Sequence, residues 1–210
     1  MPDGHPEISV EIKVETMMEE RYGKLAIANI MTSIWLGDWD TYEKFLNDVP
    51  EGMRKELSFH SLYTRDEVQL WYDNHFFIPG DHFVSPYFSS YTKNNEDEEA
   101  RRHELLCLIG LYEKTAFYFP LEQDRLPDHF GSMTAFISSI LQGEIKAEQE
   151  GDSEYLQQLE EIEVEMMTRF IKPVLKPLLE NAEVKITHPF FKEFLSFYAE
   201  MMSENWVEAA

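Results

Sequence analysis

Apolar residues recur at spacings of three and four along most of the chain, which is the spacing of one face of an α-helix. The pattern is clear from about Thr16 onward and returns after each break in the chain. It predicts helices over roughly 16–36, 38–46, 53–57, 64–76, 97–119, 127–143, 153–172 and 189–202. Apart from a weak alternation near the N-terminus, no run rich in Val and Ile alternates cleanly enough to predict a strand.

Residues that start and stop helices support these boundaries. Gly37 is suited to ending the first helix, and Asp38 to capping the second. Thr64 stands three residues before Glu67, which is the capping-box spacing. Asp152 or Ser153 starts a long helix that we expect to kink or break at two prolines, Pro173 and Pro177.

The fold class that follows is all-α, as a single multi-helix domain. Residues 1–14, with Pro2, Gly4 and Pro6, predict a flexible arm or a short extended segment, and 15–210 the helical domain. The connection near 79–95 holds Pro79, Gly80 and Pro86, and it is a hinge-like place to divide a smaller N-terminal half from a larger C-terminal one.

Charge narrows the choice of partner. The 210 residues include 18 Lys and Arg against 40 Asp and Glu, a net charge of −22. Such a chain repels phosphate backbones and anionic membrane surfaces, so we expect neither nucleic-acid binding nor stable membrane insertion. A basic peptide or protein partner is favoured; the alternative is that the acidic residues only keep the protein soluble.

The single cysteine and the first residues of the chain are typical of a cytoplasmic protein. Cys107 lies in an apolar run and reads as a small core residue, and one cysteine allows no intrachain disulfide. The first residues lack a basic start followed by an apolar core, so we expect no secretory signal. The apolar runs are also too short to cross a bilayer.

The common catalytic and cofactor motifs do not occur. No glycine-rich phosphate loop or serine elbow is present, and one cysteine excludes the usual zinc sites. The paired Glu-x-x-His motifs of di-iron bundles are also missing. We therefore expect no enzyme, no cofactor and no metal.

An Asp-His dipeptide occurs twice, each time just after a helix breaker. The two segments are Pro79-Gly80-Asp81-His82-Phe83 and Leu126-Pro127-Asp128-His129-Phe130. In one interpretation the Asp only caps a helix or turn. In the other, Asp and His point into a groove and hold a polar or cationic ligand.

The second of these segments carries a family resemblance. PLEQDRLPDHFGSMTAFISSIL resembles the TorD/DmsD family of redox-enzyme maturation chaperones, whose hallmark is a Pro- and acid-rich turn that ends in Asp-His before an apolar helix. WYDNHFFIPGDHFVSPYFSSYT resembles the aromatic helix, Pro-Gly loop and Pro-aromatic connection of that family. The resemblance covers roughly residues 20–205.

The resemblance implies a cytoplasmic, non-enzymatic chaperone. Members bind the twin-arginine signal peptide and the immature form of a molybdenum-containing oxidoreductase, assist cofactor insertion and delay export. The residues carried over as signal-peptide-binding are Asp128, His129, Pro127, Phe130, Trp71, Tyr72, Phe76, Pro86, Tyr87 and Ser89. Arg125 stands where relatives often have Glu, and a like charge there weakens contact with the signal arginines unless Glu122 or Asp124 takes over the role, so the role of this position is open.

Three further expectations remain open. The alternatives to the chaperone are a nucleotide-binding helical protein, since guanine nucleotides have been proposed for the family, and a structural assembly subunit. The family also implies either a monomer or a domain-swapped homodimer. Finally, we expect the apolar core of the signal to lie in a groove between the helix of Trp71 and Phe76 and the turn of Asp128 and His129.

Overall fold

The computed structural model describes residues 6–92, 97–118, 126–203 and 206, with side chains from residue 17 onward except that of residue 53. Within those ranges the regular structure is helical, and one isolated bridge pairs Tyr87 with His129. The α-helices are α1 (Pro6–Leu36), α2 (Trp39–Asp48), α3 (Glu51–Glu56), α4 (Arg65–Tyr72), α5 (Glu98–Lys114), α6 (Phe130–Glu150), α7 (Ser153–Glu165), α8 (Lys172–Lys185) and α9 (Pro189–Ser203). The all-α prediction is confirmed.

Four shorter helical segments complete the description. Two are 3₁₀ helices, Ser58–Leu62 and Phe88–Ser90. Two are π-helical, Asp73–Phe77 after α4 and Met166–Ile171 between α7 and α8. Short π-helical turns are rare and often lie at functional sites, which directs attention to the end of α4.

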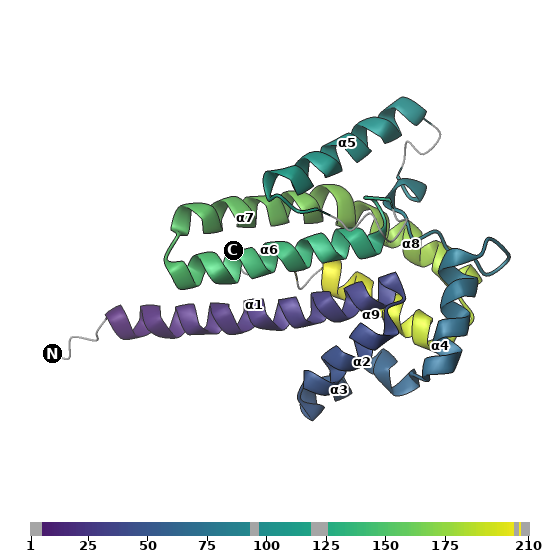
Figure 1. Ribbon diagram of the computed structural model, residues 1–210, viewed down its shortest axis with the longest axis horizontal. Helices are drawn as coiled ribbons and strands as arrows, with labels where there is room; N and C mark the ends of the chain where they lie inside the picture. The colour runs from purple at the N-terminus through teal and green to yellow at the C-terminus, as the bar shows by residue number, and fades with distance from the viewer. Residues whose placement is uncertain (1–5, 93–96, 119–125, 204–205, 207–210) are drawn as a thin grey trace.

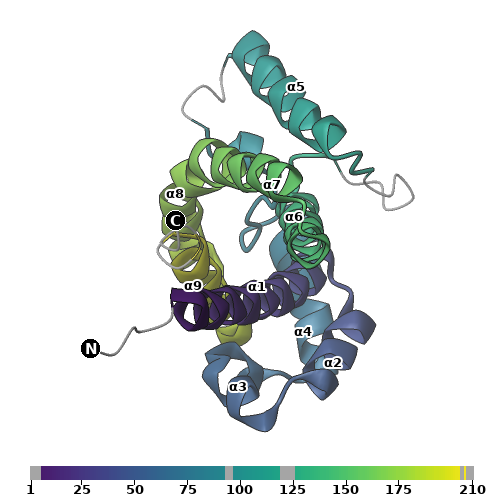
Figure 2. The same cartoon turned by 90° about the vertical axis from the view of Figure 1, so that its left-hand side faces the viewer.

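The long helices form a bundle to which the smaller ones attach. Figure 1 shows α1, α6 and α7 running side by side, while α2, α3 and α4 gather at one end and α5 leans across α7. Seen end-on in Figure 2, α1, α6, α7, α8 and α9 surround a common centre. Together these helices enclose the hydrophobic core.

One aromatic residue stands at the centre of that core. Trp35 of α1 is fully buried, and its indole contacts four other rings at centroid distances of 5.0 to 5.5 Å. These rings belong to Phe76, Phe130, Phe194 and Tyr198. Trp35 and Phe76 precede the 79–95 connection, whereas Phe130, Phe194 and Tyr198 follow it. The described residues on both sides of the connection therefore share a single core, which is not divided into the two suggested halves.

Two predicted caps are confirmed and one is wrong. The carboxylates of Asp38 and Asp152 each accept a backbone N–H from the first turn of the following helix, at 3.0 Å. Asp97, which we expected as the first residue of its helix, caps α5 in the same way. Thr64 occupies the N-cap position of α4, but its side chain makes no capping hydrogen bond. The capping-box spacing alone therefore did not establish the bond.

Some helix boundaries also differ from the prediction. Residues 6–14, expected as an arm or extended segment, are part of α1, since Pro6 suits the first position of a helix. The helix after Asp97 ends at Lys114 rather than near residue 119, and Ala116 beyond it has a φ of 53°. Residues 1–5 and Phe119 lie outside the described residues.

Gly143 does not end its helix, because α6 continues to Glu150. A Cβ at Gly143 would lie 2.8 Å from Cδ1 of Leu159 in α7, so this glycine allows α6 and α7 to approach closely. The two prolines after α7 also do not break the path, which continues through the π-helical turn into α8. Pro177 lies inside α8.

Candidate functional site

The Asp-His turn and the Pro-aromatic connection pair with each other. The Phe88 N–H donates to the Asp128 carbonyl at 2.9 Å, and the Phe130 N–H donates to the Pro86 carbonyl at 2.8 Å. These two bonds form the bridge between Tyr87 and His129. The sequence resemblance singled out both segments, and the fold joins them.

Asp128 reaches across this pairing instead of capping α6. Its Oδ2 accepts the Ser89 N–H at 3.2 Å, whereas the N-cap of α6 is His129, whose Nδ1 accepts the Gly131 N–H at 3.0 Å. The interpretation of Asp128 as a helix cap is therefore wrong. His129 takes that position because the bridge turns its ring inward, against the edge of Tyr87 at 5.2 Å.

The turn is buried. Asp128 is 3% exposed and His129 is fully buried, as is Phe130. Pro86 is buried too, whereas Pro127, Tyr87 and Ser89 are partly exposed. Pro127 is fixed through its carbonyl, which accepts the Tyr112 hydroxyl at 2.8 Å. A ligand approaching this turn meets the partly exposed residues and not the Asp128 carboxylate.

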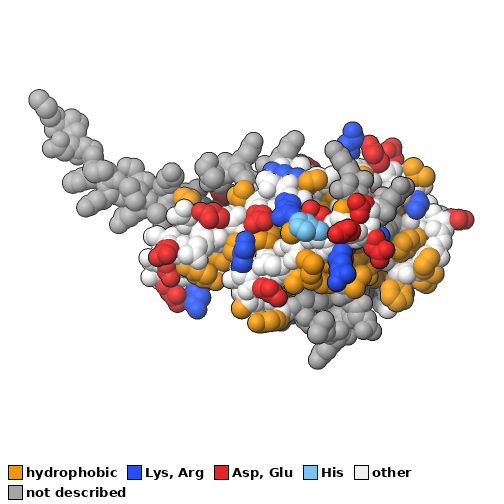
Figure 3. Space-filling model, turned by 90° about the horizontal axis from the view of Figure 1, so that it is seen from above, with side chains coloured by type: hydrophobic (Ala, Val, Ile, Leu, Met, Phe, Trp, Pro, Cys, Tyr) orange, Lys and Arg blue, Asp and Glu red, His pale blue; other side chains and the backbone are white. Residues whose placement is uncertain are grey.

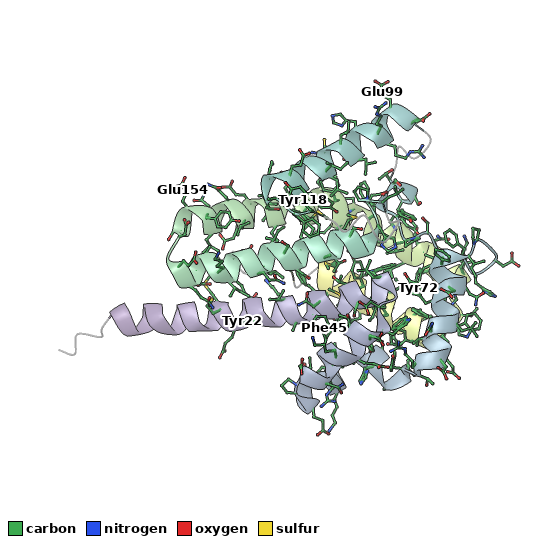
Figure 4. The ribbon with its side chains drawn as sticks, in the orientation of Figure 1. Tyr22, Phe45, Tyr72, Glu99, Tyr118 and Glu154 are labelled. Atoms are coloured by element: carbon green, nitrogen blue, oxygen red, sulfur yellow. The ribbon has the colours of Figure 1, made fainter. Side chains whose placement is uncertain are left out.

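Two aromatic residues, Tyr72 at the end of α4 and Phe76 in the π-helical turn after it, also face the core. Tyr72 and Phe76 are buried, and the Tyr72 hydroxyl donates to the Trp35 carbonyl at 2.9 Å, on the side of α4 that faces the bundle (Figure 4). Phe76 lies 5.3 Å from the indole of Trp35, and Phe130 lies 5.0 Å from the same indole. Trp35 thus contacts one ring from each of the two segments between which we expected a groove.

Trp71 belongs to a different cluster, which the sequence analysis did not identify. Its indole stacks on the ring of His75 at 5.2 Å and also lies near His82 and His188. The His75 Nδ1 lies 3.2 Å from the His82 carbonyl, and its Nε2 accepts the His188 N–H at 3.5 Å. His75 therefore joins α4, the following loop and the start of α9.

The environment of His75 keeps its ring neutral. Burial above all, together with the neighbouring His82 and His188, lowers the pKa of His75 to about 4, against the opposing effect of the bond to the His82 carbonyl. A neutral ring with Nδ1–H donating and Nε2 accepting satisfies both hydrogen bonds. These contacts fix the end of α4 to the following loop and to the start of α9, and we call them the His75 clasp.

Exposed apolar side chains gather at the end of α4. Leu70, Phe77 and Ile78 are 63%, 71% and 52% exposed, and we call these three residues the apolar corner. Leu70 lies in the last turn of α4, and Phe77 and Ile78 lie in and directly after the π-helical turn that continues it. The signal in the sequence is the run Phe76-Phe77-Ile78, whose consecutive members cannot all face the core.

Carboxylates border the apolar corner. Asp66 and Glu67 at the start of α4, Asp73 in its π-helical turn and Asp81 in the next loop are all exposed. Exposed apolar side chains next to carboxylates suit a ligand that has an apolar segment and basic residues. By contrast, the face seen in Figure 3 shows hydrophobic, acidic and basic side chains interspersed.

A buried ionic network lies on the bundle away from this corner. Arg21 of α1 donates to Glu144, Glu148 and Glu160 at 3.2, 2.6 and 2.6 Å. Burial, and then the nearby Glu163 charge, raise the pKa of Glu144, against the effect of Arg21. The network holds α1 to α6 and α7.

The described side chains include no group of three or more His, Cys, Asp or Glu arranged to hold a metal ion. No helix in the same part of the chain is both long and apolar enough to cross a membrane.

Comparison with known proteins identifies a family for the chain. No curated protein and no solved structure matches the chain. The model of a family described as the nitrate reductase delta subunit matches residues 44–176, which is more than half of the chain and includes the apolar corner and the Asp-His turn. The chain therefore belongs to the nitrate reductase delta subunit family of molybdoenzyme maturation chaperones, in agreement with its resemblance to TorD/DmsD proteins.

Proposed function

We propose that this chaperone binds the twin-arginine signal peptide of an immature molybdoenzyme at the apolar corner, in the cytoplasm, and so assists cofactor insertion and delays export. Membership of the family supports the chaperone role. The observation that carries the proposed site is the exposure of Leu70, Phe77 and Ile78 beside carboxylates.

The chemistry of the two partners is complementary. A twin-arginine signal peptide has a basic start and an apolar helical core. Guanidinium groups pair with carboxylates such as Glu67 and Asp73, and the apolar core covers side chains such as Phe77. The net charge of −22 attracts the basic peptide over a longer range and speeds its association.

The resemblance residues have a supporting role in this proposal. Asp128 and His129 hold the connection that carries Pro86, Tyr87 and Ser89, and the His75 clasp holds the loop after α4. Tyr72 and Phe76 fix α4 against Trp35. These buried residues keep the exposed apolar corner in place, and the partly exposed Trp71, Tyr87, Ser89 and Pro127 are the members of the set that a peptide can reach.

Binding of a synthetic twin-arginine peptide tests the proposal. Fluorescence anisotropy should show an affinity that falls as salt rises, and a peptide with both arginines changed to Gln should bind more weakly. Phe77→Ser should weaken binding without changing the thermal unfolding midpoint. The matched control is Leu106→Ser on α5, where Leu106 is 59% exposed, and it should bind normally.

Two results would contradict the proposed site. Equal binding of the wild-type and Gln peptides would show that pairing between carboxylates and the signal arginines does not contribute to the affinity. Unchanged affinity in Phe77→Ser, with binding otherwise intact, would place the peptide elsewhere on the chaperone.

A further inference from the structure

The face made by α8 and α9 is hollowed into a groove of about 840 Å³. One side of each helix lines it, and the two helices are joined by a short turn at 186–188. The apolar side chains along its floor are Leu175, Leu179, Ala182, Ile186, Leu195 and Ala199. Both helices are visible in Figure 2 on the opposite side of the bundle from α6.

The rims of the groove carry balanced charge in a chain that is otherwise strongly acidic. The rim of α8 reads Lys172, Lys176, Glu180, Glu183. The rim of α9 has Lys192 toward one end and Glu200 toward the other. The groove therefore has three Lys and three Glu, so the whole net charge of −22 is carried by the rest of the chain.

The order of these charges is symmetric. In α8, Lys176 and Glu180 are centred on residue 178, and Lys172 and Glu183 are centred within half a residue of it. In α9, Lys192 and Glu200 are centred on Ser196. Reversing the direction of either row therefore puts a Glu in place of each Lys and a Lys in place of each Glu.

The two centres also lie at the same level of the groove. Residues 178 and 196 are each nine positions from residue 187, the middle of the turn between the helices. At 1.5 Å of rise per residue, both centres are equally far from the turn. A single twofold axis that lies in the interface, at right angles to the length of the groove, therefore exchanges Lys and Glu positions in both rows.

We propose that the α8–α9 face is the surface by which two copies of this chain associate about a twofold axis. An interface of this kind uses the same patch on both partners. Antiparallel α8 helices place Lys172 against Glu183 of the second copy and Lys176 against Glu180 of the second copy, each twice. This dimer needs no exchange of segments between the copies.

The apolar floor and the charged rims have separate roles in this association. Covering Leu175, Leu179 and their neighbours supplies the attraction, because exposed ion pairs contribute little on their own. The charge pattern sets the direction and register. The contact of 3.8 Å between Lys176 and Glu180 within one chain is highly exposed, so exchanging it for an intermolecular pair costs little.

Charge also explains why the second copy uses this face. Two bodies of charge −22 repel each other wherever their acidic surfaces meet. The groove is neutral and self-complementary, so it is a place where like molecules can approach. Small side chains that line the groove, Ala182, Ser196 and Ala199, let the second copy come close.

Charge reversal with rescue tests the proposal. By sedimentation velocity, the wild-type chain should appear at about twice its mass of 24.8 kDa. Glu180→Lys with Glu183→Lys makes the rim of α8 entirely basic, and Lys172→Glu with Lys176→Glu makes it entirely acidic. Each double variant alone should weaken dimerisation about tenfold or more, and an equimolar mixture should recover the dimer.

A matched control separates the rim from overall charge. Glu154→Lys with Glu161→Lys changes the net charge as much as the basic-rim variant does, but both positions are exposed on α7. This control should remain a dimer, and far-ultraviolet circular dichroism should show that all variants keep their helices.

Several outcomes would overturn the proposal. They are a wild-type chain that stays monomeric at high micromolar concentration, a dimer that survives both reversals, and a mixture that stays monomeric. Wild-type monomer whose groove instead binds the twin-arginine peptide, lost in the rim variants, would also overturn it. None of these measurements of self-association depends on the apolar corner.

Discussion

The Asp128 carboxylate accepts a hydrogen bond from the Ser89 backbone N–H at 3.2 Å, although the two residues lie 39 positions apart in the sequence. The bond joins the start of α6 to the connection between α4 and α5. Asp128 is 3% exposed, so it acts here as a buried acceptor and gives the two motif segments a fixed relative position.

Asp128→Ala should lower the free energy of unfolding. The change leaves the Ser89 N–H without its acceptor, and loss of a hydrogen bond to a charged group typically costs about 1.5–3 kcal/mol. Urea unfolding followed by circular dichroism measures the loss. Because His129 and not Asp128 caps α6, Asp152→Ala, which removes the cap of α7, is a matched control that should cost about 1 kcal/mol.

Peptide affinity separates the two roles of Asp128. If Asp128 only supports the connection, binding measured well below the unfolding midpoint should change little. Normal stability together with lost peptide binding would show that the carboxylate contacts the ligand, contrary to its burial.

The sequence predicts those features that depend on neighbouring residues, and it does not predict those that depend on contacts between distant residues. The periodic apolar residues predict most helices because the pattern is local, and Asp38 and Asp152 cap as predicted for the same reason. The choice between Asp128 and His129 as cap is not local. It depends on the bridge to Tyr87, which no spacing rule contains.

The candidate site shows the same division. The resemblance identified α4 and the Asp-His turn, and the fold places both around Trp35. Which side chains of α4 remain exposed depends on the π-helical turn at Asp73–Phe77, which helical periodicity does not predict. Phe77 therefore faces solvent while Phe76 is buried, although they are adjacent and identical.

His75 should make stability fall as the pH is lowered from neutral. The pKa of His75 is about 4 in the folded protein against a usual value of 6.5, so between these values the unfolded chain binds a proton that the folded protein does not. The stabilisation is complete above pH 6.5 and is lost as pH falls toward 4. Nuclear magnetic resonance titration of the His75 ring should show no protonation until near pH 4.

A variant isolates this contribution. His75→Gln keeps hydrogen-bonding capacity but does not titrate, so its stability difference from wild type should shrink as pH falls from 7 to 4. His60 and His188, whose pKa values burial also lowers, remain in both proteins and cancel in the comparison. A constant difference across this range would show that His75 titrates alike in both states.

Glu144→Gln should stabilise the protein increasingly as pH rises above 4.5. Burial raises the folded-state pKa of Glu144 above its usual 4.5, so the folded protein holds a proton that the unfolded chain has released. Stability is therefore lost as pH rises from 4.5 to the raised pKa. Gln cannot ionise and avoids this loss, which thermal unfolding across a pH series will detect.

The control for this variant is Glu148→Gln in the same network. The Glu148 carboxylate contacts Nη1 of Arg21 at 2.6 Å, so removing its charge should lower the unfolding midpoint at neutral pH. If both variants lowered the midpoint equally at every pH, Glu144 would be an ordinary partner of Arg21.

Gly37→Ala should destabilise the protein more than Gly151→Ala, although both glycines have a left-handed backbone, with φ of 68° and 72°. An alanine in this conformation costs about 1–2 kcal/mol at either position. At Gly151 a Cβ would meet nothing within 4 Å, so that cost is the whole effect. At Gly37 a Cβ would lie 2.7 Å from Cε1 of Tyr72, whose hydroxyl is held by the Trp35 carbonyl. The ring cannot move without giving up that bond, so Gly37→Ala adds a steric cost and displaces α4, which carries the apolar corner.

Urea unfolding of both variants measures the difference, and the proposed role of the corner adds that peptide binding should weaken in Gly37→Ala alone. Equal destabilisation of the two variants would show that Tyr72 adjusts freely and that α4 is not fixed through this contact.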